Sequence, residues 1–217
     1  MSAEPGATRA RILLADDHRI VAEGLKVILA VEFDLIGVVE DGERMIEAAT
    51  TLRPDAIVAD ITMPLLNGIE ALEVLRKEGI AIPVVFLTMH REVDYASLAL
   101  EAGAAGYVLK HAAPSELVGA VRVALEGGTF VSPSLAGELF QANKLRGRDS
   151  SDDGVPLSDR QRDILRLLAD GRSAKEIGKA IDLSPRTVEF HKYKIMESLG
   201  LKNSAELIQF AIKRGLI

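Results

Sequence analysis

The sequence predicts an α/β domain with a doubly wound, parallel, five-stranded sheet, followed by a small all-α domain of four helices. Two observations support the first domain: short apolar runs alternate with helical patterns, and a polar residue follows each run. A third supports the second domain, because its segment contains closely spaced signals for helix starts and stops. We therefore expect an α/β domain over residues 9–130, a linker with a short helix over 131–155 and a helical domain over 156–217.

Polar side chains begin where the apolar runs end. Asp16 and Asp17 follow the run 12–15, and Asp60 follows the run 56–59. Two further runs end in the same manner, at Thr88 and at Lys110. Ligands of open α/β sheets bind just beyond the carboxyl ends of the strands. We therefore expect the acids, the hydroxyl and the lysine to converge.

The expected cluster has the composition of a metal and phosphoryl site. The carboxylates of Asp16, Asp17 and Asp60 repel one another, which raises their proton affinity unless a cation compensates. Ligation by oxygen alone favours a hard ion such as Mg²⁺. A carboxylate near such an ion, with a lysine and a hydroxyl alongside, can attack a phosphoryl group. The sequence therefore predicts a magnesium site with Asp60 as the nucleophile.

These residues resemble the receiver domain of two-component response regulators. The order and spacing match for Asp16-Asp17, Asp60, Met63-Pro64, Asn67-Gly68, Thr88, Tyr107 and Lys110. The resemblance implies a flavodoxin-like fold in which a sensor histidine kinase phosphorylates Asp60. It also implies that Asp16, Asp17, Asp60 and the backbone carbonyl of Thr62 bind the metal, and that Lys110 contacts the phosphoryl oxygens. Thr88 and Tyr107 would form the switch pair that changes the surface of the domain after phosphorylation.

The sequence departs from this family directly after the lysine. Many receivers have a proline there, preceded by a cis peptide bond, whereas this chain has His111. A cis bond before a residue other than proline costs roughly 3–4 kcal/mol. The bond between Lys110 and His111 is therefore either trans or held in a strained form by its surroundings.

Composition excludes several other classes of protein. The 217 residues include no cysteine, which rules out disulfides and thiol chemistry. No apolar run approaches the roughly 18 residues that a membrane crossing needs. The stretch from Met1 to Ala10 also lacks the apolar core of a signal peptide. We expect a cytoplasmic protein.

Charge divides the chain into two unequal parts. Residues 1–155 contain 14 Lys and Arg against 24 Asp and Glu, whereas residues 156–217 contain 12 against 8. The basic C-terminal part is suited to a polyanion, of which nucleic acid is the usual example. The polar stretch from Lys144 to Gly154 lies between the two parts and is typical of a linker.

The C-terminal part predicts a helix-turn-helix. Capping-box pairs and glycine stops define helices over residues 159–169, 174–181, 185–199 and 204–214. The connection from the second helix to Ser184 contains only Asp182 and Leu183, and so short a connection makes the two helices cross steeply.

The third of these helices is the candidate for DNA recognition. On a helical wheel, Val188, Ile195 and Leu199 share one face, and a polar and aromatic face lies opposite. Because the second helix of such a motif enters the major groove, the other face is expected to contact DNA. The candidates for base contact are Arg186, Glu189, Phe190 and Tyr193, and those for phosphate contact are Thr187, His191, Lys192 and Lys194.

This domain resembles the LuxR-type DNA-binding domain. The resemblance rests on Leu157–Gln161, Gly171–Gly178 and Ser184–His191, within which Thr187-Val188 and His191 form the most distinctive part. Together with the receiver it indicates a response regulator of the NarL/FixJ class. Many members of that class have a basic residue at the position of Glu189, so the preferred DNA sequence cannot be taken from a relative.

We therefore expect a transcription factor that a sensor histidine kinase controls by phosphorylating Asp60 with Mg²⁺. Two recognition helices on double-stranded DNA would roughly double the base contacts, which favours a homodimer as the active form. Two other classes stay open at this point. A phosphohydrolase also uses an aspartyl nucleophile, although it commonly needs a second carboxylate where this chain has Thr62. An interaction module or phosphate sink would bind a kinase without regulating genes.

Overall fold

The computed structural model describes residues 9–89, 91, 93–146, 157, 159–181, 183 and 185–213. The chain forms two compact units, Met1–Asn143 and Lys144–Ile217. Each unit is described by itself below.

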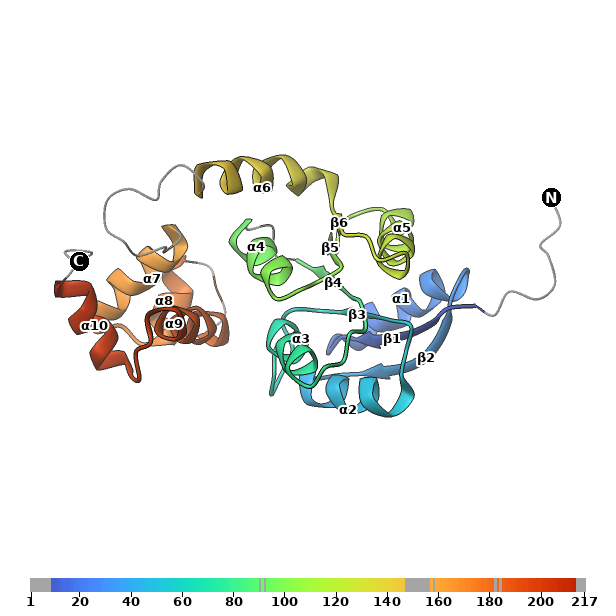
Figure 1. Cartoon of the computed structure of the whole chain (residues 1–217), viewed down its shortest axis with the longest axis horizontal. Helices are drawn as coiled ribbons and strands as arrows, with labels where there is room; N and C mark the ends of the chain where they lie inside the picture. Colours follow the sequence, from blue (N-terminus) through green and yellow to red (C-terminus); the bar gives the residue numbers. More distant parts are fainter. Residues whose placement is uncertain are drawn as a thin grey trace. The chain divides into compact units, whose positions relative to one another are not determined.

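The first unit is built around a parallel sheet with the order β2-β1-β3-β4-β5-β6 (Figure 1). Its strands are β1 Arg11–Ala15, β2 Asp34–Val39, β3 Ala56–Ala59, β4 Val84–Thr88, β5 Gly106–Leu109 and β6 Phe130–Val131. The parallel α/β architecture is confirmed, but the predicted number of five strands is wrong. The sixth strand has only two residues, so it is too short to give an apolar run of its own, and it forms by pairing with the free edge of β5.

Helices cover both faces of this sheet (Figure 1). They are α1 Arg19–Ala30, α2 Gly42–Leu52, α3 Gly68–Lys77, α4 Val93–Glu101 and α5 Pro114–Leu125, whereas α6 Pro133–Arg146 follows β6 and leaves the sheet. Side chains of successive strand residues point to opposite faces. On one face, Ile12, Leu14 and Val58 are packed with residues of α1 and α5 in a single buried cluster. The strands are therefore buried on both sides, which explains their nearly continuous apolar runs.

The helix after the sheet is longer than the sequence pattern indicated. Helix α6 extends to Arg146 and therefore includes the first residues of the predicted polar stretch. Leu135 and Leu139 are buried, whereas Phe140 is exposed. Residues 147–156, which include most of the polar stretch predicted from Lys144 to Gly154, lie outside the described residues.

The second unit contains helices α7 Asp159–Ala169, α8 Ala174–Ile181, α9 Pro185–Leu199 and α10 Ser204–Lys213. The four predicted helices are confirmed, with starts and ends that agree apart from Arg214, which lies outside the described residues. An apolar core holds them together and consists of Leu157, Leu165, Ile195, Leu207 and Ala211. None of the described helices of the chain is long and apolar enough to cross a membrane.

A glycine allows the tight connection between α8 and α9. A Cβ atom on Gly178 would lie 2.4 Å from the carbonyl oxygen of Leu183, so only glycine fits at this position without a shift of the main chain. The Leu183 N–H donates to the carbonyl of Gly178 at 2.8 Å and closes the turn. This close approach produces the helix-turn-helix that the short connection predicted.

Candidate functional site

The predicted convergence of polar side chains occurs at the carboxyl edge of the first unit's sheet. Asp16 directly follows β1, and its N–H donates to the carbonyl of Val39 at 3.0 Å. Asp60 directly follows β3, and its N–H donates to the carbonyl of Ala15 at 2.8 Å. Adjacent parallel strands therefore place the two acids side by side, since the ladder continues one residue beyond each strand.

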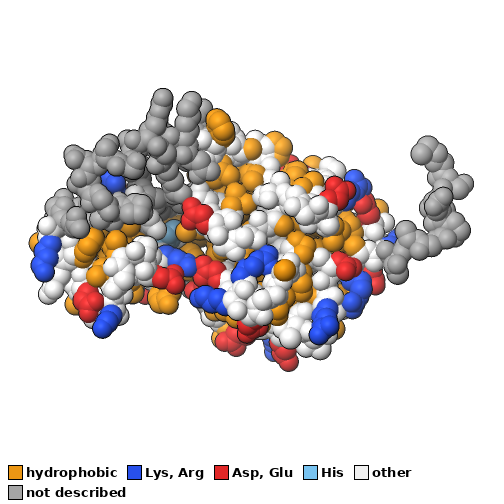
Figure 2. Space-filling model, in the orientation of Figure 1, with side chains coloured by type: hydrophobic (Ala, Val, Ile, Leu, Met, Phe, Trp, Pro, Cys, Tyr) orange, Lys and Arg blue, Asp and Glu red, His pale blue; other side chains and the backbone are white. Residues whose placement is uncertain are grey.

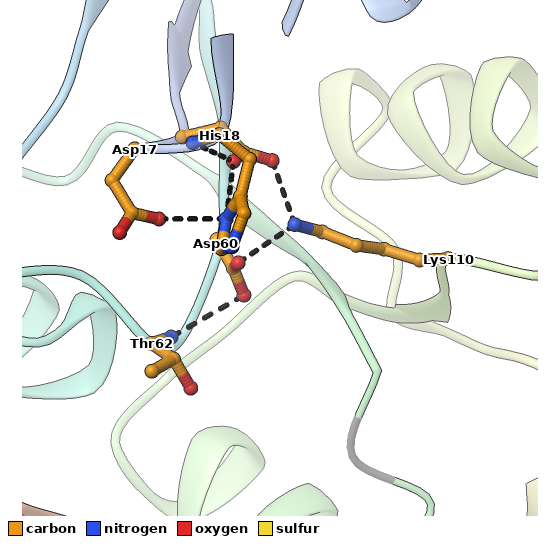
Figure 3. Close-up of polar contacts among 6 residues, drawn as sticks. Asp17, His18, Asp60, Thr62 and Lys110 are labelled. Atoms are coloured by element: carbon orange, nitrogen blue, oxygen red, sulfur yellow. Dashed lines mark hydrogen bonds and ion pairs between the residues drawn. The ribbon is translucent and has the colours of Figure 1, made fainter. Parts of the chain in front are cut away.

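Lys110 joins these two acids into one cluster (Figure 3). Its Nζ donates to Asp16 Oδ2 at 2.8 Å and to Asp60 Oδ2 at 2.7 Å. Asp16 is 1% exposed and Asp60 is 5% exposed. Figure 3 shows Lys110 extending toward Asp60 from the side opposite Asp17. A buried ammonium group between two buried carboxylates offsets part of their desolvation and of their mutual repulsion.

Burial and the neighbouring charges shift the proton affinities of this cluster. Desolvation by burial raises the pKa of Asp60 above its ordinary value, although the hydrogen bond from Lys110 opposes the increase. Burial lowers the pKa of Lys110, but hydrogen bonds to Asp16 and Asp60 outweigh that effect and raise it overall. Lys110 is therefore firmly cationic, and the charge on Asp60 depends on this lysine.

The main chain around Asp60 is held closely on both sides of the carboxylate. The N–H of Thr62 donates to Asp60 Oδ1 at 3.3 Å, a contact drawn in Figure 3. Helix α3 begins at Gly68, where an added Cβ atom would lie 2.3 Å from the carbonyl oxygen of Asp60. Asn67 caps this helix, and Asn67 and Glu70 form a complete capping box. The Asn67-Gly68 pair therefore lets α3 start directly against the backbone of Asp60.

His18 is a member of this cluster, although its position in the sequence predicts only a solvent-facing loop residue close to the site. Its backbone N–H donates to Asp16 Oδ1 at 2.8 Å, and Nδ1 of its imidazole ring lies 2.9 Å from Asp17 Oδ1. The contact with Asp17 is visible in Figure 3. Its place directly after the two acids was the available signal, but sequence alone does not tell which way an exposed loop histidine points.

The cluster could hold a metal ion. Asp16, Asp17, His18 and Asp60 each offer a ligand atom, and these atoms lie within 4.8 Å of one another. The three carboxylates supply the oxygen donors that hard divalent cations prefer, and the imidazole nitrogen of His18 is the weaker partner for such ions. The donor set therefore fits Mg²⁺ through its acids.

The remaining predicted residues of the first unit lie on β4 and β5. Thr88 ends β4 and Tyr107 lies within β5, and both side chains are completely buried. The N–H of Lys110 donates to the carbonyl of Thr88 at 2.8 Å, so these two strand ends are paired. No cis peptide bond occurs in the described part of the chain, which makes the bond between Lys110 and His111 trans.

The predicted DNA-binding residues lie on α9. Tyr193 is 60% exposed, and the exposed Glu189 forms an ion pair with Lys192. Phe190 is 4% exposed, however, and the Nζ of Lys194 lies 5.9 Å from the centroid of its ring. The placement of Phe190 on a solvent-facing surface was therefore wrong.

His191 is also completely buried, and its ring meets the ring of Phe190 edge to face. His191 comes three residues after Val188 and four before Ile195, so it lies on the core face of α9 and its burial agrees with the helical period. Phe190 lies away from that face, and a helical wheel takes no account of the long side chain of Lys194 that lies over its ring. The side chains of Arg186 and Thr187 lie outside the described residues.

Both units match known protein families. Residues 12–122 match the response regulator receiver domain, and residues 155–211 match the bacterial regulatory proteins of the luxR family. The chain is 34% identical over 209 residues to the transcriptional regulatory protein MctR of Rhizobium johnstonii, covering 95% of each chain. It is 33% identical over 214 residues to the oxygen regulatory protein NreC of Staphylococcus carnosus, covering 95% of this chain and 99% of that one.

Solved structures of RcsB are similar over both units. RcsB from Salmonella enterica serovar Typhimurium, bound to promoter P1flhDC in the presence of phosphomimetic BeF3-, is 26% identical with a TM-score of 0.62. The similarity covers 93% of this chain and 97% of that chain. A second RcsB structure, of two dimers bound to two parallel DNAs, has a TM-score of 0.60 at 26% identity and the same coverage.

The first unit has a parallel sheet with an acidic cluster at its carboxyl edge, and the second unit contains a helix-turn-helix. This combination defines the class of DNA-binding response regulators. The chain belongs to this family, in the NarL/FixJ arrangement of a receiver domain followed by a LuxR-type DNA-binding domain. Of the two relatives, MctR is named a transcriptional regulatory protein and NreC an oxygen regulatory protein.

Proposed function

We propose that a sensor histidine kinase phosphorylates Asp60 and that this phosphorylation controls binding of the second unit to DNA. One observation supports the proposal most strongly: Asp60 is almost completely buried beside a second carboxylate and a lysine, at the carboxyl edge of a receiver sheet. A structural ion pair alone would not need the additional acid Asp17 at the mouth of the cluster. Phosphoryl transfer to an aspartate needs such positioned charges.

The residues of the cluster have distinct parts in this transfer. An Asp60 carboxylate oxygen forms the new O–P bond while the bond between phosphorus and the imidazole nitrogen of the kinase breaks, and the electron pair stays with that nitrogen. Lys110, whose Nζ already lies 2.7 Å from Asp60 Oδ2, offsets negative charge on the phosphoryl oxygens. The N–H of Thr62 orients the other oxygen of Asp60. In this way the receiver assists its own phosphorylation and dephosphorylation.

Asp16, Asp17, Asp60 and the backbone carbonyl of Thr62 are the proposed ligands of Mg²⁺. When bound there, the ion supplies positive charge that neutralises the carboxylates and the phosphoryl oxygens.

Thr88 and Tyr107 are the proposed switch pair. Both are buried in the paired strands β4 and β5, where Thr88 lies opposite Leu109, the residue before Lys110. In receiver domains the threonine hydroxyl moves toward the acyl phosphate and the aromatic side chain follows. That movement would alter the surface formed by β5 and α5.

The second unit is proposed to bind double-stranded DNA through α9. Arg186, Glu189 and Tyr193 are the proposed base contacts, and Thr187, Lys192 and Lys194 are the proposed phosphate contacts. We do not expect direct contacts from Phe190 and His191 while they are buried. The RcsB structure with dimers on DNA favours a homodimer for this chain, in which two recognition helices reach successive turns of the major groove.

The proposed domain limits are 9–130 for the receiver, 131–155 for the linker with its helix and 156–217 for the DNA-binding domain. The proposed location is the cytoplasm, where both the kinase's catalytic part and the DNA are accessible. Under this proposal the protein is a transcription factor and not an enzyme that turns over a separate substrate.

The proposal is tested by intact mass and DNA affinity, each measured with and without a small phosphodonor and Mg²⁺. The wild type should gain one phosphoryl group and bind DNA more tightly or dimerise. Asp60→Ala should gain none, and Asp34→Ala, which changes an exposed acid at the opposite end of the sheet, should behave as the wild type. A wild type without adduct but with undiminished DNA binding would mean that the receiver is a constitutive scaffold.

A further inference from the structure

Ser132 occupies an unusual position between the sheet and the helix that leaves it. This serine follows β6, precedes Pro133 at the start of α6 and is 1% exposed. Its hydroxyl accepts a hydrogen bond from the N–H of Leu109 at 3.2 Å and donates one to Glu116 Oε1. A buried hydroxyl is therefore used for contacts within the receiver.

The backbone explains why a side-chain oxygen is needed there. Along the β5–β6 ladder, Phe130 N–H donates to the carbonyl of Ala105 at 3.0 Å, and Ser132 N–H donates to that of Tyr107 at 2.9 Å. The next acceptor along a parallel ladder would be the carbonyl of Ser132. That carbonyl instead accepts from the N–H groups of Leu135 and Ala136, because α6 begins at this point. The hydroxyl of Ser132 takes its place and satisfies the N–H of Leu109.

The two partners of this hydroxyl lie on either side of the loop that contains Lys110. Leu109 is the last residue of β5 and directly precedes Lys110. Glu116 lies in the first turn of α5, where its N–H donates to the carbonyl of Ala113 at 2.8 Å. The hydroxyl of Ser132 therefore forms hydrogen bonds with residues on both sides of the loop 110–113, at the place where the chain leaves the receiver sheet.

We propose that Ser132 and Glu116 are positioning residues for Lys110. This inference rests on the proposed phosphorylation of Asp60 and adds two residues to it that lie outside the acidic cluster. The Nζ of Lys110 reaches Asp16 and Asp60 only while the main chain at Leu109 and Lys110 keeps its position. A long flexible side chain loses affinity for its partner when its own backbone is free to move, because more freedom must then be lost on contact.

The test uses the full chain, a small phosphodonor and Mg²⁺, and it measures the rate of phosphoryl uptake by intact mass. Ser132→Ala should slow uptake roughly five-fold, the factor expected for the loss of one net hydrogen bond. Ser134→Ala makes the same chemical change at an exposed serine of α6 and should leave the rate unchanged.

A second pair of variants keeps the test valid if Ser132→Ala does not fold. Glu116→Gln retains an oxygen that can accept from the serine hydroxyl and should have nearly the wild-type rate. Glu116→Ala lacks that acceptor and should be slowed to a similar extent as Ser132→Ala. Equal rates for Glu116→Ala and Glu116→Gln would overturn the proposal.

A double-mutant comparison separates positioning from a general structural role. In the background of Lys110→Ala, the change Ser132→Ala should have no further effect, because the side chain that it positions is gone. An equal slowing in both backgrounds would overturn the proposal, as would an unchanged rate for Ser132→Ala alone. A wild type that takes up no phosphoryl group would remove the proposed function and this inference with it, whereas wild-type uptake with unaffected variants would remove only this inference.

Discussion

At the scale of single residues, the charge balance of the acidic cluster depends on one buried lysine. Lys110 is the cation between Asp16 and Asp60, and both acids are almost inaccessible to solvent. Burial raises the pKa of Asp60, while the contact with Lys110 opposes that change. A cation therefore stabilises the two buried carboxylates, and their burial without one would lower the free energy of unfolding.

We expect Lys110→Met to lower the free energy of unfolding by about 3 kcal/mol at neutral pH without divalent cations, because two buried carboxylates then face each other with no lysine between them. Added Mg²⁺ should recover part of this loss. Chemical denaturation of the variant with and without Mg²⁺ measures both effects.

Lys77→Met, at an exposed position near the end of α3, is the matched control and should unfold as the wild type does. Equal stability of the two variants would show that the Lys110 contacts contribute nothing net to folding.

At the scale of elements, the turn between α8 and α9 depends on a close contact of the main chain. Gly178 is buried, and a Cβ atom there would lie 2.4 Å from the carbonyl oxygen of Leu183. A backbone carbonyl cannot move aside as the end of a flexible side chain can. The crossing of these two helices, and with it the direction of α9, depends on this position.

Gly178→Ala should therefore lower the thermal stability of the second unit, by an amount on the order of 1–3 kcal/mol as for other overpacked sites. Gly24→Ala is the control, since it lies within α1 with no atom near the added methyl group. That change should stabilise the chain by somewhat under about 1 kcal/mol through helix propensity. Calorimetry of both variants measures whether stability falls for Gly178→Ala and rises for Gly24→Ala. A Gly178→Ala variant more stable than the wild type would contradict the close contact with the carbonyl of Leu183.

Helix α8 also begins with a charge-sensitive cap. Glu176 accepts hydrogen bonds from the hydroxyl and the N–H of Ser173, and these bonds lower the pKa of Glu176. A lowered folded-state pKa means that the carboxylate stabilises the helix above the ordinary pKa of glutamate, and that this contribution disappears as the pH falls through the folded-state pKa.

Ser173→Ala removes the hydroxyl that is the largest cause of this shift, so the pKa of Glu176 should rise toward its ordinary value. Titration of the Glu176 carboxyl carbon by NMR in the two proteins measures the change. An identical titration midpoint in wild type and variant would exclude the cap as the cause.

At the scale of the whole molecule, charge separates the two units. The first 155 residues have an excess of acids and the last 62 have an excess of bases. Charged side chains of both signs are scattered over the visible face of the receiver unit, with no large area of one sign (Figure 2). The basic excess of the second unit makes it the part suited to DNA, and binding by such a unit weakens with salt.

We expect Lys192→Ala to weaken binding on all DNA sequences alike and to reduce the slope of log affinity against log salt by about 0.9, the change for one phosphate contact. Glu189→Ala should instead relax the preference at one base position, since glutamate can accept from cytosine N4. Affinities over a salt series and selection from random DNA sites measure these effects.

Lys77→Ala in the receiver is the control and should change neither quantity. Because Glu189 and Lys192 form an ion pair, a selected-site profile that changed equally in both variants would mean that the pair acts as a unit.

Much of the phosphoryl site could be predicted because it depends on strand ends. Asp16, Asp60 and Lys110 each directly follow an apolar run, and parallel strands bring such ends to one edge of the sheet. The helices of the second unit were equally predictable, since caps such as Ser173 and stops such as Gly200 act locally. Strand β6 was not predictable, because two residues carry no periodicity and pair only where an edge is free.

The sequence by itself determined the architecture, the order of the polar strand ends and the limits of the DNA-binding helices, because periodicity, caps and turn lengths act over a few residues. Tertiary structure alone decided which groups meet: His18 with Asp17, the hydroxyl of Ser132 with Leu109 and Glu116, and Lys194 over the ring of Phe190. The direction of a side chain depends on the space that packing leaves and on which backbone groups still need a partner, and neither is set by neighbours in the sequence.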